Sequence, residues 1–318
     1  TMEQKNKLIP ELRFPEFVKD GEWKENLLGE ISEIVRGGSP RPIQDYLTTS
    51  SEGLNWLKIA DVHSDSKYIT ATKEKVINEA LSSTREVDCG DLILSNSMSF
   101  GRPYILKIKT CIHDGWIAIR KISNVTFEDY LYYFISSEAC QHYFNINAAG
   151  AAVKNLNAEI IKLLPISLPK NIKEQQKIAD CLSSLDELIT AHNDKLETLK
   201  NHKKGLLQNL FPQEGQKVPN YRFPEFVNDG EWESKTVKDV AYYENGKAHE
   251  QDILDNGKYK VVNSKFISTE GKVVKYSNKA HCLAEKNDVL MVLSDVPNGR
   301  AIAKCFFVNE NNLYTVNQ

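Results

Sequence analysis

Residues 169–211 read PKNIKEQQKIADCLSSLDELITAHNDKLETLKNHKKGLLQNLF, and this stretch decides how the chain is organised. Its apolar positions recur in steps that alternate between four and three residues, which is the heptad pattern of a coiled coil. The pattern predicts one helix, roughly 55–60 Å long at 1.5 Å per residue, with a narrow apolar seam. The seam residues that we expect to contact a partner are Ile178, Leu182, Leu185, Ile189, His192, Leu196, Leu199, Leu206 and Leu210.

The sequence also marks where this helix begins. Pro169 ends the preceding segment, and Asn171 stands three residues before Glu174. That spacing predicts a capping box, with asparagine in the place of serine or threonine. A helix of this length with only one apolar seam needs a partner to cover the seam.

One fifteen-residue sequence occurs twice, once before and once after the long helix. Residues 9–23 (repeat 1) read IPELRFPEFVKDGEW, and residues 218–232 (repeat 2) read VPNYRFPEFVNDGEW, with eleven identical positions. A repeat separated by 209 residues indicates a duplicated module and not a solenoid. We therefore predict a first module over residues 1–168, a central helix over 169–212 and a second module over 213–318.

Both modules carry short apolar runs separated by turn residues, which is the pattern of a β-rich domain. Examples are DLILSNS (91–97) in the first module and DVLMVLS (288–294) in the second. The first module also has helical spacing over 130–144 and 156–164. The predicted fold class is α+β, with a β-rich module, a long coiled-coil helix and a second copy of the module.

The second copy is shorter than the first. Gln318 falls just past the position that matches Ile112 and His113 of the first module. The second copy therefore has no counterpart of the run GWIAIRKI (115–122), of the later helices or of a second long helix. We expect this module to be incomplete.

Composition narrows the class of protein. A length of 318 residues suggests about two domains, and a net charge of −3 means that any nucleic-acid binding must be local. The six cysteines are scattered without a Cys-x-x-Cys pair, which favours reduced thiols over disulfides or a zinc site. No run approaches 18 apolar residues, and the N-terminus lacks a signal-peptide core. We expect a cytoplasmic protein.

Motifs of an enzyme that acts alone are missing from the sequence. It contains no Asn/Asp-Pro-Pro-aromatic loop, no Pro-Cys nucleophile, no Gly-x-Gly cofactor turn after a strand and no Gly-x-x-x-x-Gly-Lys-Ser/Thr loop. The sequence therefore predicts no catalytic residue, no metal site and no cofactor of its own.

Several polar loops have the chemistry of a DNA-binding surface. The segment RGGSPR (36–41) places two guanidiniums in one loop, where each offers a bidentate fork to guanine or phosphate and glycine permits close approach. Asparagine suits adenine, and hydroxyls suit phosphates. Each loop also fits an ordinary solvated turn. The predicted DNA-binding residues are Arg36, Ser39, Arg41, Ser95, Asn96, Ser97, Ser99, Arg102, Lys154, Asn155 and Asn157 in the first module, and Lys247, Asn263, Lys265, Asn298 and Arg300 in the second.

These features together resemble a known family, the specificity subunits of type I restriction–modification enzymes. Repeats 1 and 2, the segment GDLILS (90–95) and the run from Gly150 are similar to a target recognition domain. The segment KEQQKI (173–178), entering a long helix, is similar to the start of the family's central helical region.

The resemblance implies a subunit without catalysis of its own. Each recognition domain would read one half of a split site in double-stranded DNA, and the helices would set the distance between the halves. Two modification subunits would grip the helices and methylate adenine, and restriction subunits are further partners. S-adenosylmethionine, ATP and Mg²⁺ would belong to those partners, and no membrane is involved.

One departure from the family leaves two readings open. The family packs two helices antiparallel within one chain, whereas this chain has one. We expect the seam to pair with the same helix of another copy or to be covered by modification subunits. The alternative function is a truncated assembly protein, which pairs through its helix or occupies modification subunits without binding DNA specifically.

Overall fold

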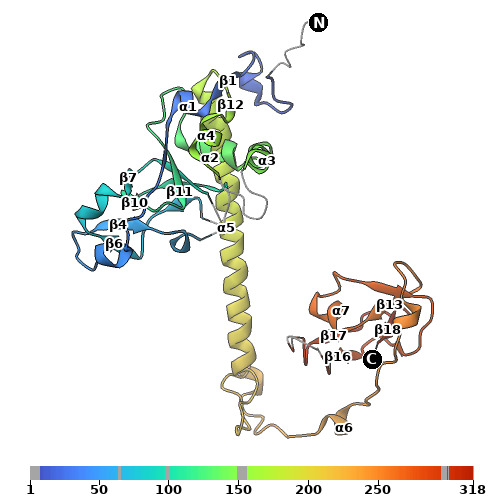
Figure 1. The fold of residues 1–318 in the computed structure, drawn as a ribbon. Coiled ribbons are helices and arrows are strands. Elements are labelled where there is room, and N and C mark those ends of the chain that lie inside the picture. Colours follow the sequence, from blue (N-terminus) through green and yellow to red (C-terminus); the bar gives the residue numbers. More distant parts are fainter. Residues whose placement is uncertain are drawn as a thin grey trace, which may run out of the picture. The chain divides into compact units, whose positions relative to one another are not determined.

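A computed structural model of the protein describes residues 8–63, 66–96, 101–148, 156–294, 299 and 301–317. The chain divides into two compact units, Thr1–Lys203 and Lys204–Gln318. Both units combine helices and sheets, which confirms the predicted α+β class (Figure 1). In the part of the chain that the structure describes, no helix is both long enough and apolar enough to cross a membrane.

Unit 1 contains two five-stranded sheets and a short strand pair. The first sheet has the order β3-β6-β4-β10-β7, with bounds Leu47–Thr48, Glu74–Val76, Leu54–Leu57, Thr110–Ile112 and Arg85–Val87. The second has the order β2-β11-β8-β9-β5, with bounds Glu33–Arg36, Trp116–Arg120, Leu92–Ser95, Pro103–Leu106 and Tyr68–Ile69. The antiparallel pair joins β1 (Lys24–Leu27) to β12 (Pro165–Leu168).

The second sheet is the central layer of unit 1. Successive side chains of a strand point to opposite faces, so the apolar run of β8 serves two cores. Leu92 and Leu94 pack with the helices, whereas Ile93 packs with the first sheet. The helices of unit 1 before the long one are α1 (Leu28–Ile31), α2 (Glu128–Ser136), α3 (Glu138–Asn147) and α4 (Ala158–Lys162).

The helix predicted over 130–144 is two helices. Ser137 lies between α2 and α3 in an extended conformation, and its Oγ accepts a hydrogen bond from the backbone N–H of Cys140 at 3.3 Å. A serine that caps one helix interrupts the run from the previous one. The periodicity of the apolar residues did not reveal this break, because α2 and α3 pack against the same core.

The long helix α5 spans Ile172–Asn209, close to the predicted range. Asn171 caps it, since its Oδ1 accepts from the N–H of Lys173 at 3.1 Å. The predicted capping box is wrong in its second half. The carboxylate of Glu174 instead accepts two hydrogen bonds of 2.7 Å from Arg13 and one of 3.2 Å from the indole of Trp23. A bidentate guanidinium is a stronger partner for a carboxylate than a single backbone N–H.

Repeat 1 therefore holds the start of α5. The side chains of Arg13 and Glu174 are 6% and 1% exposed, so their ion pair is buried. Asp20 accepts a hydrogen bond of 2.8 Å from the amide of Asn171. Lys177, one turn further along α5, lies 3.6 Å from Glu16. Repeat 1 is thus a receptor for the first two turns of the helix.

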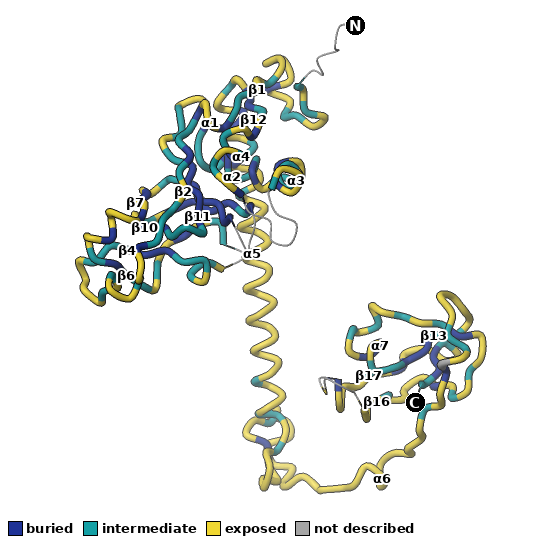
Figure 2. The backbone as a smooth tube through the Cα atoms, viewed as in Figure 1, coloured by how far each residue is buried: buried dark blue, intermediate teal, exposed yellow. Residues whose placement is uncertain are grey.

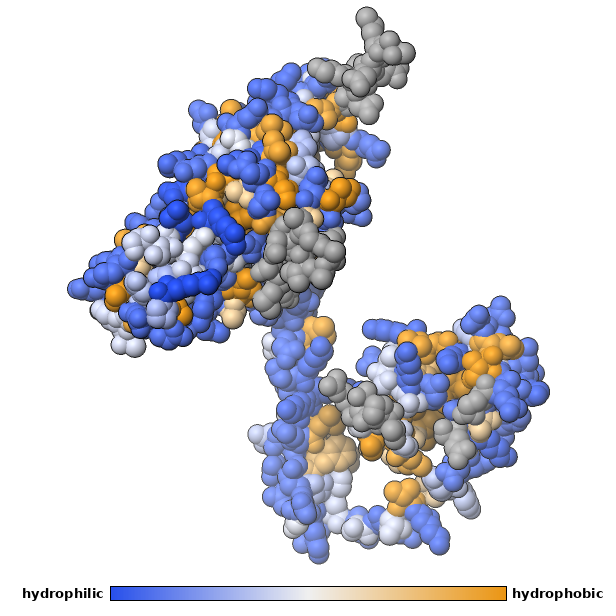
Figure 3. Space-filling model, in the orientation of Figure 1, coloured by the Kyte–Doolittle hydropathy of each residue, from blue (hydrophilic) through white to orange (hydrophobic). Residues whose placement is uncertain are grey.

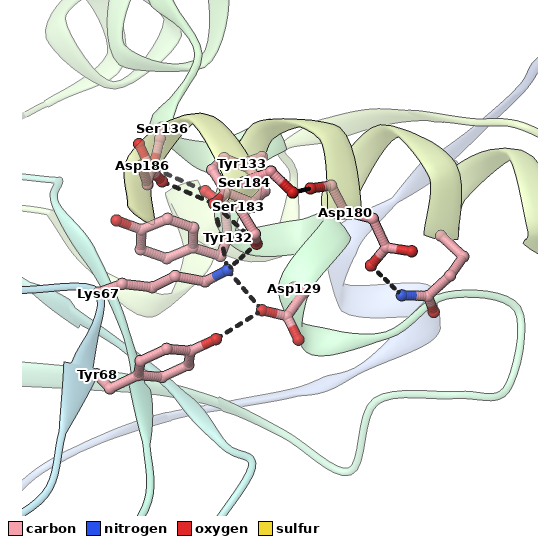
Figure 4. Close-up of polar contacts among 11 residues, drawn as sticks. Lys67, Tyr68, Asp129, Tyr132, Tyr133, Ser136, Asp180, Ser183, Ser184 and Asp186 are labelled. Carbon is pink, nitrogen blue, oxygen red and sulfur yellow. Dashed lines mark hydrogen bonds and ion pairs between the residues drawn. The ribbon is translucent and has the colours of Figure 1, made fainter. Parts of the chain in front are cut away.

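A second anchor lies about two turns further along α5 (Figure 4). The ammonium of Lys67 lies 2.6 Å from the carboxylate of Asp129 and donates to Ser183 of α5 at 2.9 Å. The hydroxyl of Tyr133 donates to Asp186 of α5 at 2.7 Å. Burial alone would lower the pKa of Lys67, but its hydrogen bonds to Asp129 and Tyr133 outweigh that effect and raise it. The lysine stays charged at neutral pH.

Beyond these anchors the residues of α5 are mostly exposed to solvent (Figure 2). Every residue from 184 to 204 is exposed. Within the seam, Ile178 packs against the core of unit 1, and Leu210 is half-buried. Six apolar seam residues are 37–58% exposed, namely Leu182, Leu185, Ile189, Leu196, Leu199 and Leu206, and His192 is also exposed. In Figure 3 hydrophobic side chains interrupt the otherwise hydrophilic surface of this helix.

Unit 2 contains one four-stranded sheet and a strand pair. The sheet has the order β14-β13-β18-β15, with bounds Lys275–Ser277, Tyr259–Val262, Tyr314–Val316 and Leu283–Ala284. The antiparallel pair joins β16 (Val289–Met291) to β17 (Cys305–Phe307). Its helices are α6 (Val237–Val240) and α7 (Ser264–Ser268).

The pairing of these strands repeats that of unit 1. β13 runs parallel to β18 and antiparallel to β14, as β4 does to β10 and β6. β15 and β18 pair antiparallel, as β7 and β10 do. The apolar run over 288–294 forms β16, which is shorter than the run and pairs with β17. The duplication seen in the sequence is a duplication of the fold.

The buried ion pair leads to a prediction about the free energy of unfolding. Replacing Glu174→Gln leaves the Arg13 guanidinium buried without a counter-charge, which typically costs about 3 kcal/mol or more. We expect urea denaturation, followed by circular dichroism, to show this loss in the free energy of unfolding of unit 1.

The matched control is Glu16→Gln, since Glu16 also belongs to repeat 1 but is 48% exposed. An exposed pair contributes at most about 1 kcal/mol. Equal midpoints for the two variants would contradict the anchoring role of Glu174.

Candidate nucleic-acid interface

The arginine-rich loop 36–41 lies on the turn that follows β10. The N–H of Gly37 donates to the carbonyl of Trp116 at 2.9 Å, and that of Gly38 donates to Ile112 at 3.1 Å. A Cβ on Gly37 would overlap the carbonyl oxygen of His113. Glycine is thus required here for the close approach of two loops of the same chain. Its role in the approach of DNA stays a prediction.

Four predicted DNA-binding residues converge on one acidic residue, Asp114. Ser39 donates its hydroxyl to Oδ1 of Asp114 at 2.8 Å, and Arg41 lies 3.6 Å from Oδ2. The backbone carbonyl of Asp114 accepts from Arg36 Nε at 3.1 Å and from the amide of Asn96 at 3.0 Å. Residues that are up to 78 positions apart in the sequence therefore form one polar cluster, which we name the Asp114 cluster.

The carboxylate at the centre of this cluster is ionised, and the two arginine side chains around it are exposed to solvent. The hydrogen bond from Ser39 holds the pKa of Asp114 below its ordinary value, so the carboxylate is ionised at neutral pH. Burial lowers the pKa of the neighbouring His113. Arg41 is 83% exposed. Arg36 is also exposed, and its two terminal nitrogens have no partner among the described residues.

Asn96 itself is only 5% exposed. The remaining predicted residues of the first module differ in their exposure. Ser95 is fully buried at the end of β8, so it cannot contact DNA without a rearrangement. Arg102 is half-buried, with its guanidinium 5.7 Å from the centre of the Tyr104 ring. Asn157 caps α4 by accepting from the N–H of Ile160 at 2.9 Å. Four predicted residues lie outside the described ranges, namely Ser97, Ser99, Lys154 and Asn155.

Unit 2 repeats the packing of the two loops. A Cβ on Gly246 would overlap the carbonyl oxygen of Asn317, as one on Gly37 would overlap that of His113. The N–H of Lys247 donates to the carbonyl of Val316 at 3.0 Å, in the manner of Gly38. The predicted residue Lys247 therefore occupies the position in unit 2 that matches the arginine-rich loop of unit 1, and it is exposed.

The other predicted residues of unit 2 lie around α7 or outside the described ranges. Asn263 caps α7, since its Oδ1 accepts from the N–H of Phe266 at 2.9 Å. Lys265 is exposed on that helix. Asn298 and Arg300 lie outside the described residues.

Sequence reasoning missed the residue at the centre of the first cluster. Asp114 and Gly115 stand between two strand runs, and an Asp-Gly pair in that position is a known turn signal. The signal gives the turn but not its partner, because the loop that packs on it lies about 75 positions earlier. Across the described residues, no group of histidine, cysteine, aspartate and glutamate side chains is arranged to hold a metal ion.

The fold and this surface can be compared with known proteins. A family model described as "Type I restriction modification DNA specificity domain" matches residues 20–201, which is more than half of the chain. The chain belongs to this family. The match covers the Asp114 cluster and most of α5, so the family assignment rests on unit 1 rather than on unit 2.

Two curated relatives are specificity subunits from Methanocaldococcus jannaschii. The type I restriction enzyme MjaVIII specificity subunit is 24% identical over 261 residues, which are 77% of this chain and 54% of the relative. The MjaIX specificity subunit is 25% identical over 283 residues, 84% of this chain and 62% of the relative. The chain thus spans little more than half the length of these specificity subunits.

Two solved structures of specificity subunits match parts of this chain. The HsdS subunit from Thermoanaerobacter tengcongensis is 20% identical, with a TM-score of 0.42, and the match covers 57% of this chain and 41% of that one. The S subunit of a type I system from M. genitalium is 13% identical, with a TM-score of 0.49, over 92% of this chain and 71% of that one.

The tight packing of the two loops predicts a defect from a single methyl group. We expect Gly37→Ala to lower the free energy of unfolding by about 1–3 kcal/mol, because the added Cβ meets backbone that cannot move aside. Thermal denaturation measures the change. The control is Gly205→Ala in α5, where the added Cβ meets nothing within 4 Å.

Alanine is a better helix former than glycine, so this control should be neutral or stabilising by about 0.5–1 kcal/mol. A Gly37→Ala protein as stable as the wild type would show that the two loops are not packed as described.

Proposed function

We propose that the protein is the DNA sequence-specificity subunit of a type I restriction–modification system. The observation that carries the proposal is the Asp114 cluster, in a chain whose family is a DNA specificity domain. The terminal nitrogens of Arg36, which have no partner in the part of the chain that the structure describes, suit a phosphate or the O6 and N7 atoms of guanine. The accessible guanidinium of Arg41 adds a second contact. Because the backbone of the two loops is already fixed, less conformational entropy is lost when DNA binds.

The two units would each read one half of a split site. Support comes from the repeated loop packing, in which Lys247 of unit 2 matches the arginine-rich loop of unit 1. The 38 residues of α5 give a rigid element of about 57 Å. That length compares with one to two turns of DNA, at roughly 34–36 Å per turn. The length of the helix would therefore set the spacing of the half-sites.

The exposed seam of α5 would be the docking surface for the catalytic subunits. Six apolar side chains that are 37–58% exposed on one helix are a surface that a soluble protein normally covers. We infer that two modification subunits, which are adenine methyltransferases, bind it and that restriction subunits join the same assembly. The specificity subunit would have no catalytic activity of its own. S-adenosylmethionine, ATP and Mg²⁺ would bind to those partners.

A second candidate function is assembly without specific DNA binding. The observation that favours it is the same bare seam, which also suits antiparallel pairing with α5 of another copy. In that case the chain would occupy modification subunits without directing them to a sequence. The two functions differ in whether the complex with modification subunits distinguishes one DNA sequence from another.

The proposed function predicts that removing the guanidiniums weakens DNA binding. We expect Arg36→Ala combined with Arg41→Ala to reduce the affinity of the complex for its methylated sequence by about tenfold or more, since one base or phosphate contact contributes about 1–3 kcal/mol. Electrophoretic mobility shift at moderate salt, with a random-sequence competitor, measures the loss.

The matched control replaces Lys19 and Lys24, which are exposed on unit 1 away from the cluster, by alanine. Wild-type affinity and specificity in the Arg36/Arg41 variant would remove the Asp114 cluster from the interface. A wild-type complex without any sequence-dependent shift would favour the assembly function instead.

A further inference from the structure

One carboxylate oxygen of Asp114 is unused within the Asp114 cluster. Oδ1 accepts the hydroxyl of Ser39 at 2.8 Å, and the N–H of Asp114 donates back to Oγ of Ser39 at 3.3 Å. Oδ2 accepts no hydrogen bond from any residue that the structure describes, and the exposed Arg41 lies 3.6 Å from it. Since 45% of the Asp114 side chain is exposed, this oxygen is available to a donor from outside the chain.

The neighbouring histidine does not neutralise this carboxylate. Nδ1 of His113 lies 3.5 Å from Oδ1 of Asp114, but it accepts the N–H of Gly115 at 2.7 Å and therefore carries no proton. Burial lowers the pKa of His113, so its ring is neutral at neutral pH. Asp114 thus presents an ionised acceptor to the solvent.

The backbone of Asp114 holds a hydrogen-bond donor beside this acceptor. Its carbonyl oxygen accepts from Nε of Arg36 at 3.1 Å. This bond uses Nε and leaves the two terminal nitrogens of the guanidinium for another partner. An acceptor on Asp114 and a pair of donors on Arg36 are therefore fixed on the same turn.

Few groups of DNA suit a carboxylate. It only accepts hydrogen bonds, and phosphates repel it. The donors in the major groove are the 4-amino group of cytosine and the 6-amino group of adenine. The amino group of adenine stands beside N7, an acceptor that would face the same carboxylate, whereas the amino group of cytosine has no acceptor on its groove side. Cytosine is therefore the better partner.

We propose that Asp114 is a specificity-determining residue, whose Oδ2 accepts a hydrogen bond from the 4-amino group of a cytosine in the half-site read by unit 1. Arg36 binds the guanine or phosphate next to this cytosine. The inference rests on the proposed function, because it names one base that the recognition module selects.

A role in ordering the loops alone would not require the negative charge of Asp114. Asparagine has the same shape and keeps an oxygen that can accept from Ser39. The bonds to the backbone carbonyl, from Arg36 and Asn96, do not involve the side chain. The substitution Asp114→Asn therefore separates base reading from loop packing.

The test compares the wild-type and Asp114→Asn chains, each in complex with modification subunits. Selection from a random DNA library gives the base preference at every position of the site. We expect the wild type to require cytosine at one position where the variant does not, because a carboxamide both donates to and accepts from a base. Affinity for the wild-type site should fall about tenfold or more. Affinity for random DNA should not fall, since the variant loses a charge that phosphates repel.

A modified base tests the same contact with the unaltered protein. Cytosine methylated on its 4-amino nitrogen still pairs with guanine, and the methyl group replaces the amino hydrogen that faces the major groove. At one cytosine of the site, this methyl group should weaken binding of the wild type about tenfold or more. It should have little further effect on Asp114→Asn, because the two changes remove the same bond.

The matched control is Glu25→Gln, which removes an exposed acidic charge on β1 and should leave the base preferences unchanged. A wild-type complex without base preferences would overturn the proposed function and this inference together. Preferences that Asp114→Asn leaves intact, or weakens equally at all positions with a lower melting temperature, would overturn this inference alone. A wild-type requirement for adenine at the affected position would overturn the assignment to cytosine.

Discussion

The buried ion pair between Arg13 and Glu174 is the constraint on which the rest of unit 1 depends. It joins residues 161 positions apart and leaves almost no access for water. If either partner is misplaced, a buried charge is left uncompensated, so the native arrangement is strongly favoured over alternatives. The pair fixes where α5 begins, and the second anchor at Lys67 fixes its direction over the next turns. The start of α5 is thus attached to unit 1 at two points.

If α5 sets the distance between two DNA contacts, as proposed, it needs a rigid connection to each of them. A spacer can set the distance between two DNA contacts only if the contacts cannot pivot about its end. In unit 1 the Asp114 cluster is itself held by hydrogen bonds between two paired loops. Unit 2 repeats the paired loops and the local structure of the fifteen-residue repeat. The repeated parts explain why one sequence motif occurs twice in the chain.

The local features of this fold were predictable, and the long-range ones were not. The heptad pattern placed α5 within about three residues of its observed bounds, because helix period and capping are encoded by neighbours. The recurrence of one fifteen-residue sequence indicated duplication for the same reason. By contrast, Glu174 looked like part of a capping box, since nothing near it shows that Arg13 folds back onto it. Asp114 was missed as the centre of the site because its partners come from other parts of the chain. The loop with Arg36 was found, but the packing of its glycines on the facing backbone was not predicted.

Hydrogen exchange along α5 tests the central claim most directly, namely that the helix is clamped at its start and offers the remainder to catalytic partners. With the chain alone, the account predicts strong protection of the amides over 172–186 and fast exchange over 187–209, where the side chains are mostly exposed. Addition of modification subunits should then protect 187–209 without changing 172–186. Fast exchange at the helix start, or unchanged exchange over 187–209 in a complex that has demonstrably formed, would contradict the account.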